Sequence, residues 1–284
     1  MTYSQLYRTV RDRLSCAGIE AAAYEARCLL EELIGIDRLR LISRGNDAVS
    51  DDEYNILISA AEKRADGYPL QYIIGKWSFM GREFLVGEGV LIPRDDTETA
   101  VMTCCEAVKE LPSPRIIDLC SGSGIIAVTL SKLLKSADIT ALELSSTAFG
   151  YLERNTELNE CKSITALKAD IFKAYGDFED GCFDAIISNP PYISRDVIPT
   201  LQKEVRHEPV SALDGGPDGL DFYRCIAKDW MPKLKPGGSV TLEIGEEQAQ
   251  AVMELLSENG IGRIRVVKDI QGLDRVIFGT KKHS

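Results

Sequence analysis

Short apolar strands alternate with helical segments along the chain from Arg115 to Gly279. Strands are expected at Arg115–Cys120, Ile139–Leu144, Ile164–Ala169, Phe183–Ser188, Ser239–Ile244, Arg263–Lys268 and Arg275–Gly279, and helices near 125–135, 146–159, 219–232 and 246–258. This alternation predicts a mostly parallel sheet with helices on both faces. Only Gln271-Gly272-Leu273-Asp274 joins the last two strands, so that edge is expected to be antiparallel. The fold class is therefore α/β, a doubly wound sheet of seven strands.

The first 65 residues have a helical pattern instead. Apolar residues recur at helical spacing in Tyr3–Ala17, Ala21–Ile34 and Asp51–Ala65, and Ser50 with Glu53 forms the pattern of a capping box. These segments predict a small helical bundle. Nothing in the bundle looks catalytic, so we interpret it as a module that docks a partner.

A connector separates the bundle from the sheet. Residues Trp77–Val86 alternate like a β-hairpin around Gly81, and a helix capped by Asp95 or Asp96 is expected to follow. The expected domains are a helical domain over 1–75, a hairpin connector over 76–92 and a catalytic domain over 93–284.

Composition excludes several classes of protein. The net charge of −11 lacks the basic surplus of a sequence-independent DNA binder, so no direct nucleic-acid binding is expected. No apolar stretch is long enough to cross a membrane and no signal peptide opens the chain, so we expect a cytoplasmic protein. Eight cysteines without a C-x-x-C pair, and only two histidines, indicate reduced thiols and no metal site.

A glycine-containing loop follows the first strand of the sheet. Cys120-Ser121-Gly122-Ser123-Gly124 leads directly into an apolar helix, whose free N–H groups face an approaching ligand. Glu143 ends the next strand, where an acid accepts hydrogen bonds from ribose hydroxyls. Together they predict a nucleoside site. Ala127 stands at the third glycine position of the dinucleotide fingerprint, which leaves a nicotinamide cofactor as an alternative.

Two further strand ends carry polar residues. Asp170 and Ile171 follow the third strand, where they either meet an adenine ring or simply cap the strand. Asn189-Pro190-Pro191-Tyr192 follows the fourth. The prolines end the strand and stiffen the chain, so the Asn189 side-chain oxygen and the Pro190 carbonyl are held as acceptors for a planar NH2 group, beside the flat face of Tyr192. The alternative interpretation is an ordinary turn.

The order of Asp118–Gly124, Glu143, Asp170 and Asn189–Tyr192 resembles the class I methyltransferases, Rossmann-like enzymes that use S-adenosylmethionine, and among them those that methylate planar nitrogens. Further segments resemble the N5-glutamine methyltransferases of peptide chain release factors. They are Gly67–Gly75, Leu91-Ile92-Pro93-Arg94 with Thr97-Glu98, Glu208-Pro209, Ala212-Leu213, Gly215–Leu220, Pro236-Gly237-Gly238, Leu242–Gly245 and Asp274-Arg275. The resemblance covers about residues 65 to 284.

The resemblance implies methyl transfer from S-adenosylmethionine to the glutamine of the Gly-Gly-Gln motif of release factors. It assigns Cys120, Ser121, Gly122, Ser123, Gly124, Glu143, Ile171 and Asn189 to the cofactor, and Asn189, Pro190, Pro191 and Tyr192 to the substrate, with Asn189, Pro190 and Tyr192 catalytic. A monomer is expected. A ribosomal protein as the glutamine substrate, and adenine-N6 methylation of DNA, are alternatives.

The chain departs from the family pattern at four positions. Cys120 replaces a glycine, Glu143 replaces an aspartate, Asp95 interrupts a Pro-Arg-Pro sequence, and Ile171 stands where some members carry an aromatic residue. None of these changes removes a group that the chemistry needs.

Overall fold

The computed structural model describes residues 1–283, which form two compact units. The first unit contains Met1–Lys76 together with Gln202–His207, and the second contains Trp77–Leu201 and the chain from Glu208 onward. The first unit is therefore built from two stretches of sequence. Within residues 1–283, no helix has both the length and the apolar character needed to cross a membrane.

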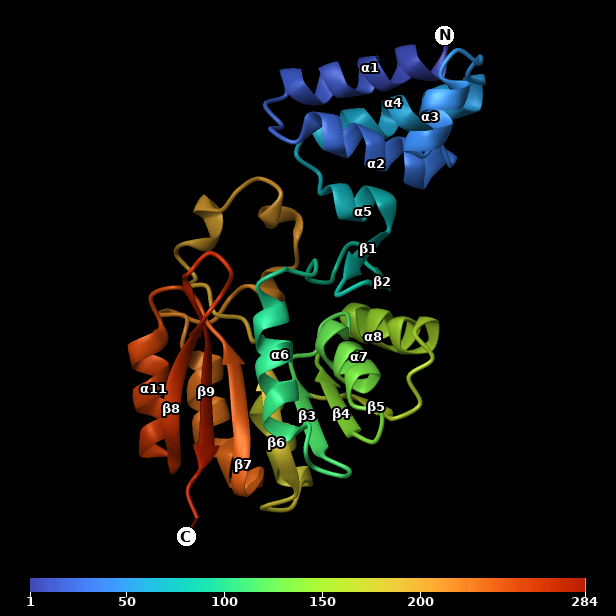
Figure 1. The fold of residues 1–284 in the computed structure, drawn as a ribbon. Coiled ribbons are helices and arrows are strands. Elements are labelled where there is room, and N and C mark those ends of the chain that lie inside the picture. The colour runs from blue at the N-terminus through green and yellow to red at the C-terminus, as the bar shows by residue number, and fades with distance from the viewer. Residues whose placement is uncertain (284) are drawn as a thin grey trace. The chain divides into compact units, whose positions relative to one another are not determined.

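Five helices make up most of the first unit (Figure 1). They are α1 (Tyr3–Cys16), α2 (Ala22–Ile34), α3 (Arg38–Arg44), α4 (Asp51–Ala65) and α5 (Leu70–Ile74). The helical domain predicted from the sequence is confirmed, and so is the capping box of Ser50 and Glu53 at the start of α4. Helix α3 was not predicted, because none of its residues is buried and its apolar spacing carries no signal. It begins where the Asp37 side chain accepts from Arg40 N.

The segment Gln202–His207 packs through charged and aromatic contacts inside the first unit. Arg64 is only 4% exposed and forms a two-pronged ion pair with Glu25, with Nε–Oε2 at 2.5 Å and Nη2–Oε1 at 3.1 Å. Its Nη2 also binds Glu204 Oε1 at 2.7 Å. A buried charge needs such partners, so Glu204 helps to satisfy Arg64. The ring of His207 lies 5.2 Å from that of Tyr68.

A hairpin of β1 (Lys76–Phe79) and β2 (Arg82–Leu85) follows, as predicted. Its two turn residues, Met80 and Gly81, both have positive φ, which suits the tight turns that match the twist of antiparallel strands.

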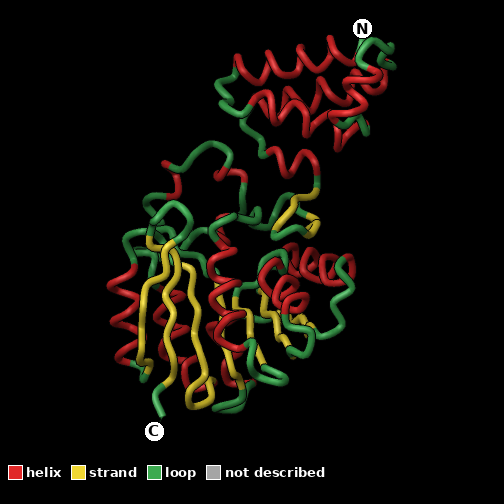
Figure 2. The backbone as a smooth tube through the Cα atoms, in the orientation of Figure 1, coloured by secondary structure: helices red, strands yellow, loops and turns green. Residues whose placement is uncertain are grey.

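The second unit contains a sheet of seven strands in the order β5-β4-β3-β6-β7-β9-β8 (Figure 2). The strands are β3 (Arg115–Leu119), β4 (Asp138–Glu143), β5 (Ile164–Lys168), β6 (Phe183–Ser188), β7 (Leu234–Glu243), β8 (Ile261–Lys268) and β9 (Asp274–Lys281). Strand β9 pairs antiparallel with both β7 and β8, and the other pairs are parallel. The doubly wound sheet and its antiparallel edge are thus confirmed.

Helices cover both faces of this sheet. On one face lie α6 (Thr97–Val108), α7 (Ile125–Leu133) and α8 (Ser146–Leu158), packed on side chains such as Ile116 and Ala185. On the other lie α9 (Ile171–Ala174), α10 (Asp221–Cys225) and α11 (Ala249–Glu258), over neighbours that include Ile117 and Ile186. Adjacent residues of a strand point to opposite faces, so both cores use the same strands.

The helix predicted near 219–232 differs from expectation. Helix α10 covers only Asp221–Cys225 and continues as a π-helix over Ile226–Trp230 and a 3-10 turn over Met231–Lys233. Pro232 cannot supply an N–H to a regular α-helix, which accounts for the end. The wider π turn accompanies a bond from Trp230 Nε1 to the Ile171 carbonyl at 3.0 Å.

Candidate active site

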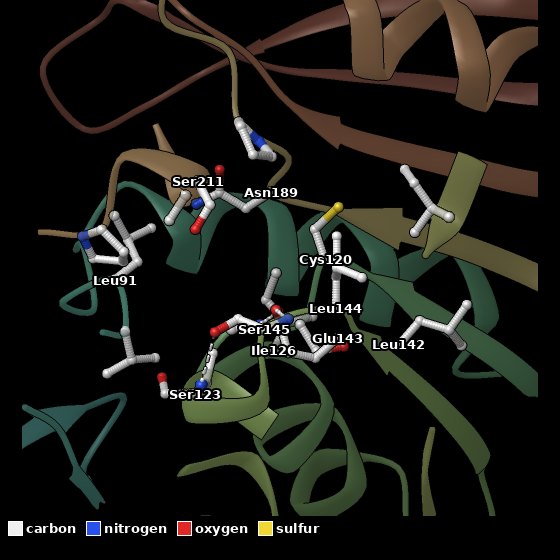
Figure 3. A pocket seen from close by; sticks show the side chains of 18 of the residues that line it. Leu91, Cys120, Ser123, Ile126, Leu142, Glu143, Leu144, Ser145, Asn189 and Ser211 are labelled. Atoms are coloured by element: carbon white, nitrogen blue, oxygen red, sulfur yellow. Dashed lines mark hydrogen bonds between the residues drawn. The ribbon is translucent and has the colours of Figure 1, made fainter. Parts of the chain in front are cut away.

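Strand order brings three predicted motifs to one edge of the sheet. Leu119 in β3 pairs with Leu142 in β4 on one side and with Ser188 in β6 on the other. The next residues along these strands are Cys120, Glu143 and Asn189, and all three line a single cavity of about 210 Å³ (Figure 3). The chain winds in opposite directions from β3, and open α/β sheets bind ligands where the strand order reverses.

The loop after β3 is held in a conformation that exposes its backbone. Cys120 has φ +62°, a left-handed value that ordinarily favours glycine, and Gly122 has φ +55° with open space where a Cβ would stand. Ser121 N donates to the Leu142 carbonyl at 2.9 Å. The departure from glycine at Cys120 therefore leaves the expected turn in place.

Glu143 braces the loop as well as facing the cavity. Its Oε2 accepts from Gly122 N at 2.8 Å, and its Oε1 accepts from Ser145 N at 2.7 Å at the start of α8. Burial raises the pKa of the carboxyl, while these backbone donors oppose the rise. Each carboxylate oxygen has a second lone pair, so both oxygens can still accept from a ligand.

Asp118 is a buried acid that the sequence did not single out as a site residue. It is fully buried beneath the loop, and neither carboxyl oxygen has a hydrogen-bond partner within residues 1–283. Burial and the nearby charge of Glu143 raise its pKa to about 8. The raised pKa favours the protonated acid near neutral pH.

Asn155 of α8 ties the loop to the hairpin. Its Nδ2 donates to the carbonyls of Ser123 at 2.9 Å and Leu85 at 3.0 Å, and its Oδ1 accepts from Leu85 N at 2.7 Å. The side chain is fully buried. Leu85 and Ser123 are 70 and 32 positions away along the chain, so no local sequence pattern predicts these contacts of Asn155.

Two aromatic side chains contribute to the cavity wall. Asp170 caps α9, where its Oδ1 accepts from Phe172 N at 3.0 Å, and Ile171 is buried. Phe172 and Phe222 both line the cavity, with ring centroids 5.1 Å apart in an edge-to-face arrangement. The aromatic surface that Ile171 lacks is therefore supplied by Phe172 and Phe222, neither of which was among the predicted site residues.

The Asn-Pro-Pro-Tyr segment leaves β6 at the cavity wall. Asn189 Nδ2 donates to Thr97 Oγ1 at 3.2 Å, and Figure 3 shows the Asn189 side chain extending into the cavity. The Tyr192 carbonyl accepts from Gln248 Nε2 at 3.0 Å. A Cβ on Gly219, which has φ +76°, would come within 2.3 Å of that carbonyl. Glycine is therefore required for the close approach that braces the segment.

Glu208 joins two other parts of the cavity wall. Its Oε2 accepts from Ile92 N at 3.0 Å and its Oε1 accepts from the Arg94 guanidinium. Ile92, Arg94 and Pro209 all line the cavity. The resemblance had marked these segments without giving their contact.

The predicted site residues divide into two groups. Those that line the cavity are Cys120, Ser121, Gly122, Ser123, Glu143, Ile171, Asn189 and Pro191. Gly124, Pro190 and Tyr192 are not among the lining residues. Gly124 is the N-cap of α7, where it has φ +84° and packs beside the Leu152 side chain. Tyr192 is partly buried, and this burial raises the pKa of its hydroxyl to about 12.

Known proteins share this organisation. Residues 5–75 match the PrmC N-terminal domain and residues 94–215 match the methyltransferase small domain. A release factor glutamine methyltransferase of Thermodesulfovibrio yellowstonii is 38% identical over 92% of this chain and 93% of its own length. The chain belongs to the release factor glutamine methyltransferase family. A member from Moorella thermoacetica is 36% identical over 99% of both chains.

Solved structures place this family member within the methyltransferase fold. The hMettl16 catalytic domain, solved in complex with MAT2A 3'UTR hairpin 1, has a TM-score of 0.57 at 15% identity and covers 82% of this chain and 81% of its own. A methyltransferase from Pyrococcus furiosus has a TM-score of 0.52 at 18% identity, over 83% of this chain and all of its own.

Proposed function

We propose that this protein transfers a methyl group from S-adenosylmethionine to the side-chain nitrogen of the glutamine in the Gly-Gly-Gln motif of release factors. The observation that carries the proposal is one cavity lined by both Glu143 with its glycine-containing loop and the Asn189 amide. The first is suited to a nucleoside and the second to a planar NH2 group. The names of relatives at 36–38% identity support the choice of substrate.

The residues around the cavity fit S-adenosylmethionine. Glu143 offers carboxylate lone pairs for ribose hydroxyls, and Phe172 with Phe222 offers flat apolar surface for adenine. Open space beside Gly122 admits a ligand close to the backbone. Bound there, the cofactor would supply a methyl group that its sulfonium already activates.

The protein's own contribution is to position the amide nitrogen. That nitrogen is a weak nucleophile because its lone pair is delocalised into the carbonyl group. Asn189 Oδ1 and the Pro190 carbonyl are acceptors for its two N–H groups, and both would draw it toward pyramidal geometry. Holding reactants in a near-attack pose lowers a barrier by up to ~7–11 kcal/mol. The same acceptors stabilise the positive charge that develops on nitrogen.

We propose further that residues 1–75 dock the protein substrate. Leu39 and Ile42 of α3 are 76% and 74% exposed. Arginines, including Arg38 and Arg40, lie beside them in the same helix. Exposed apolar residues within a charged rim are typical of a protein-binding surface.

Intact-mass measurement tests the function directly. The protein and S-adenosylmethionine are incubated with a release factor, with a variant whose Gly-Gly-Gln glutamine is replaced by alanine, and with ribosomal proteins. One added methyl on the release factor alone, placed on that glutamine by fragmentation, is the expected result. Methylation of the alanine variant or only of a ribosomal protein would overturn the substrate.

A further inference from the structure

Asn189 has a side-chain partner outside its own segment. Its Nδ2 donates to Oγ1 of Thr97, the first residue of α6, which is fully buried. An amide has its nitrogen and oxygen on opposite sides, so this bond turns Oδ1 away from α6. The orientation matters because only the oxygen can accept an N–H from a substrate amide.

A buried acid lies behind Thr97. Glu243 ends β7 and is 1% exposed, and its Oε2 has no hydrogen-bond partner within the described residues 1–283. Thr97 lies close enough to lower the pKa of this carboxyl. Sequence alone connects none of these residues, since Thr97 and Asn189 are 92 positions apart.

The single proton of the Thr97 hydroxyl determines how the side-chain amide of Asn189 is oriented. A hydroxyl has one proton to donate and lone pairs to accept with, whereas an ionised carboxylate can only accept. An ionised Glu243 can accept the Thr97 proton, and Thr97 Oγ1 is then left as an acceptor. The Asn189 nitrogen is then the group that fits against Thr97, and the oxygen faces the cavity.

We propose that the Thr97 hydroxyl donates to Glu243 while it accepts from Asn189. Glu243 and Thr97 are then positioning residues, which keep Asn189 Oδ1 presented to the substrate amide. The proposal rests on the function proposed above. A buried, partly unpaired carboxyl is costly to keep, and this role gives a reason for it beyond packing.

Protonation of Glu243 would reverse the arrangement. Burial raises its pKa to about 7, opposed by Thr97 and by arginine charge. The charged and titratable groups around it come from four segments of the second unit. They are Arg275 in β9, Arg94 and Asp96 before α6, Tyr192 after β6, and Tyr223 in α10. Once protonated, the carboxyl can donate to Thr97, and the threonine proton is freed to bond Asn189 Oδ1. The amide nitrogen would then face the cavity, so activity should fall as pH is lowered through about 7.

Two substitutions at Thr97 provide the test. Thr97→Val keeps the shape and removes the hydroxyl, whereas Thr97→Ser keeps the hydroxyl. Methylation of release factor is followed by intact mass at saturating substrate, and binding of S-adenosylhomocysteine by calorimetry. Thr97→Val should lower kcat by about tenfold, the size of one ordinary hydrogen bond, with unchanged S-adenosylhomocysteine affinity. Thr97→Ser should recover most of the rate.

A double-mutant cycle separates positioning from general damage. In an Asn189→Ala background there is no amide to orient, so Thr97→Val should cause no further loss of kcat. A loss caused by disturbed packing would persist in that background. The low-pH fall in kcat should also be flattened in Thr97→Val and in Glu243→Gln, although both retain Asp118 and the other acids of the site.

The outcomes separate this inference from the proposed function. Two results would overturn the positioning role and leave the function standing. In the first, Asn189→Ala is slow but Thr97→Val methylates at the wild-type rate. In the second, Thr97→Val lowers kcat by the same factor in the Asn189→Ala background as in the wild type. Absence of glutamine methylation by the wild-type protein would overturn both.

Discussion

Leu119 and Ser188 are register partners on the adjacent parallel strands β3 and β6. The residues that follow them, Cys120 and Asn189, therefore leave the sheet beside each other although 69 positions separate them in sequence. This pairing places the part of the cavity proposed to bind a nucleoside against the part proposed to bind an amide. Methyl transfer needs both parts within one reaction distance, and the strand pairing supplies that before any ligand binds.

Replacement of Asn189 tests the amide clamp. Asn189→Ala removes an acceptor that matters most in the transition state, so kcat should fall by roughly 10²–10³ while cofactor affinity changes much less. Asn189→Asp keeps an acceptor of the same size and should retain part of the activity. Rates by intact mass and affinities by calorimetry provide the check. A wild-type rate for Asn189→Ala would return the segment to the role of a simple turn.

Replacement of Glu143 should affect binding before catalysis. Glu143→Ala loses acceptors for ribose and releases Gly122 N and Ser145 N, so cofactor binding should weaken by on the order of 1.5–3 kcal/mol for each hydrogen bond to the charged group. Calorimetry with S-adenosylmethionine measures the loss. Unchanged affinity, or preferential binding of NAD, would contradict the assignment.

Asp118 predicts an unusual dependence of stability on pH. Its pKa is raised from 3.8 to about 8 in the folded protein, so folding favours the protonated acid. The stabilising contribution is complete below pH 3.8 and is lost as pH rises toward 8, at about 1.4 kcal/mol per pH unit. Asp118→Asn has no such loss, so its thermal stability relative to wild type should improve steadily between pH 5 and 8.

The matched control for that series is Asp138→Asn, at an exposed position where β4 begins. Its stability difference from wild type should change little with pH. Parallel behaviour of the two variants in thermal unfolding scans would show that burial of Asp118 is not the cause.

Two glycines in left-handed conformations separate backbone strain from a local clash. Gly219→Ala places a Cβ against the Tyr192 carbonyl, whereas Gly272→Ala, at φ +85° in the β8–β9 turn, meets open space. Both should pay about 1–2 kcal/mol for conformation, but only Gly219→Ala should also lower kcat by displacing the Asn-Pro-Pro-Tyr segment. Denaturant titration and methylation rates together distinguish them. Equal effects on kcat would argue against a brace at Tyr192.

Substitutions on α3 test the docking role of the helical unit. Leu39→Ser with Ile42→Ser should raise KM for an intact release factor while leaving KM for a short Gly-Gly-Gln peptide unchanged. Ile270→Ser is the control, because Ile270 is 94% exposed and lies in the other unit. A rise in KM for both substrates would indicate a general defect instead of lost docking.

The elements of the site that were predictable from sequence lie within one strand and the turn after it. Glu143 and Asn189 each follow an apolar strand directly, so local periodicity and composition were enough to place them at the sheet edge. The same reasoning gave the hairpin around Gly81, where turn chemistry is local.

What escaped prediction depends on contacts between distant segments. Thr97 meets Asn189, and Asn155 meets the hairpin, only after the sheet has assembled. Phe222 reaches the cavity from a helix whose π continuation has no periodic signal. Glu243 looked like part of an apolar strand, and only its burial without a partner for Oε2 within residues 1–283 marks it as unusual.

The return of Gln202–His207 into the helical unit has a consequence for protein engineering. Arg64 keeps its second carboxylate partner only when Glu204 is present, and one of the ring contacts of Tyr68 is made by His207. A chimera that takes its helical domain from a relative must therefore exchange two stretches, Met1–Lys76 and Gln202–His207, in one step. Grafting the first stretch alone would join an arginine from one parent to a glutamate loop from the other, and natural recombination at that single boundary faces the same barrier.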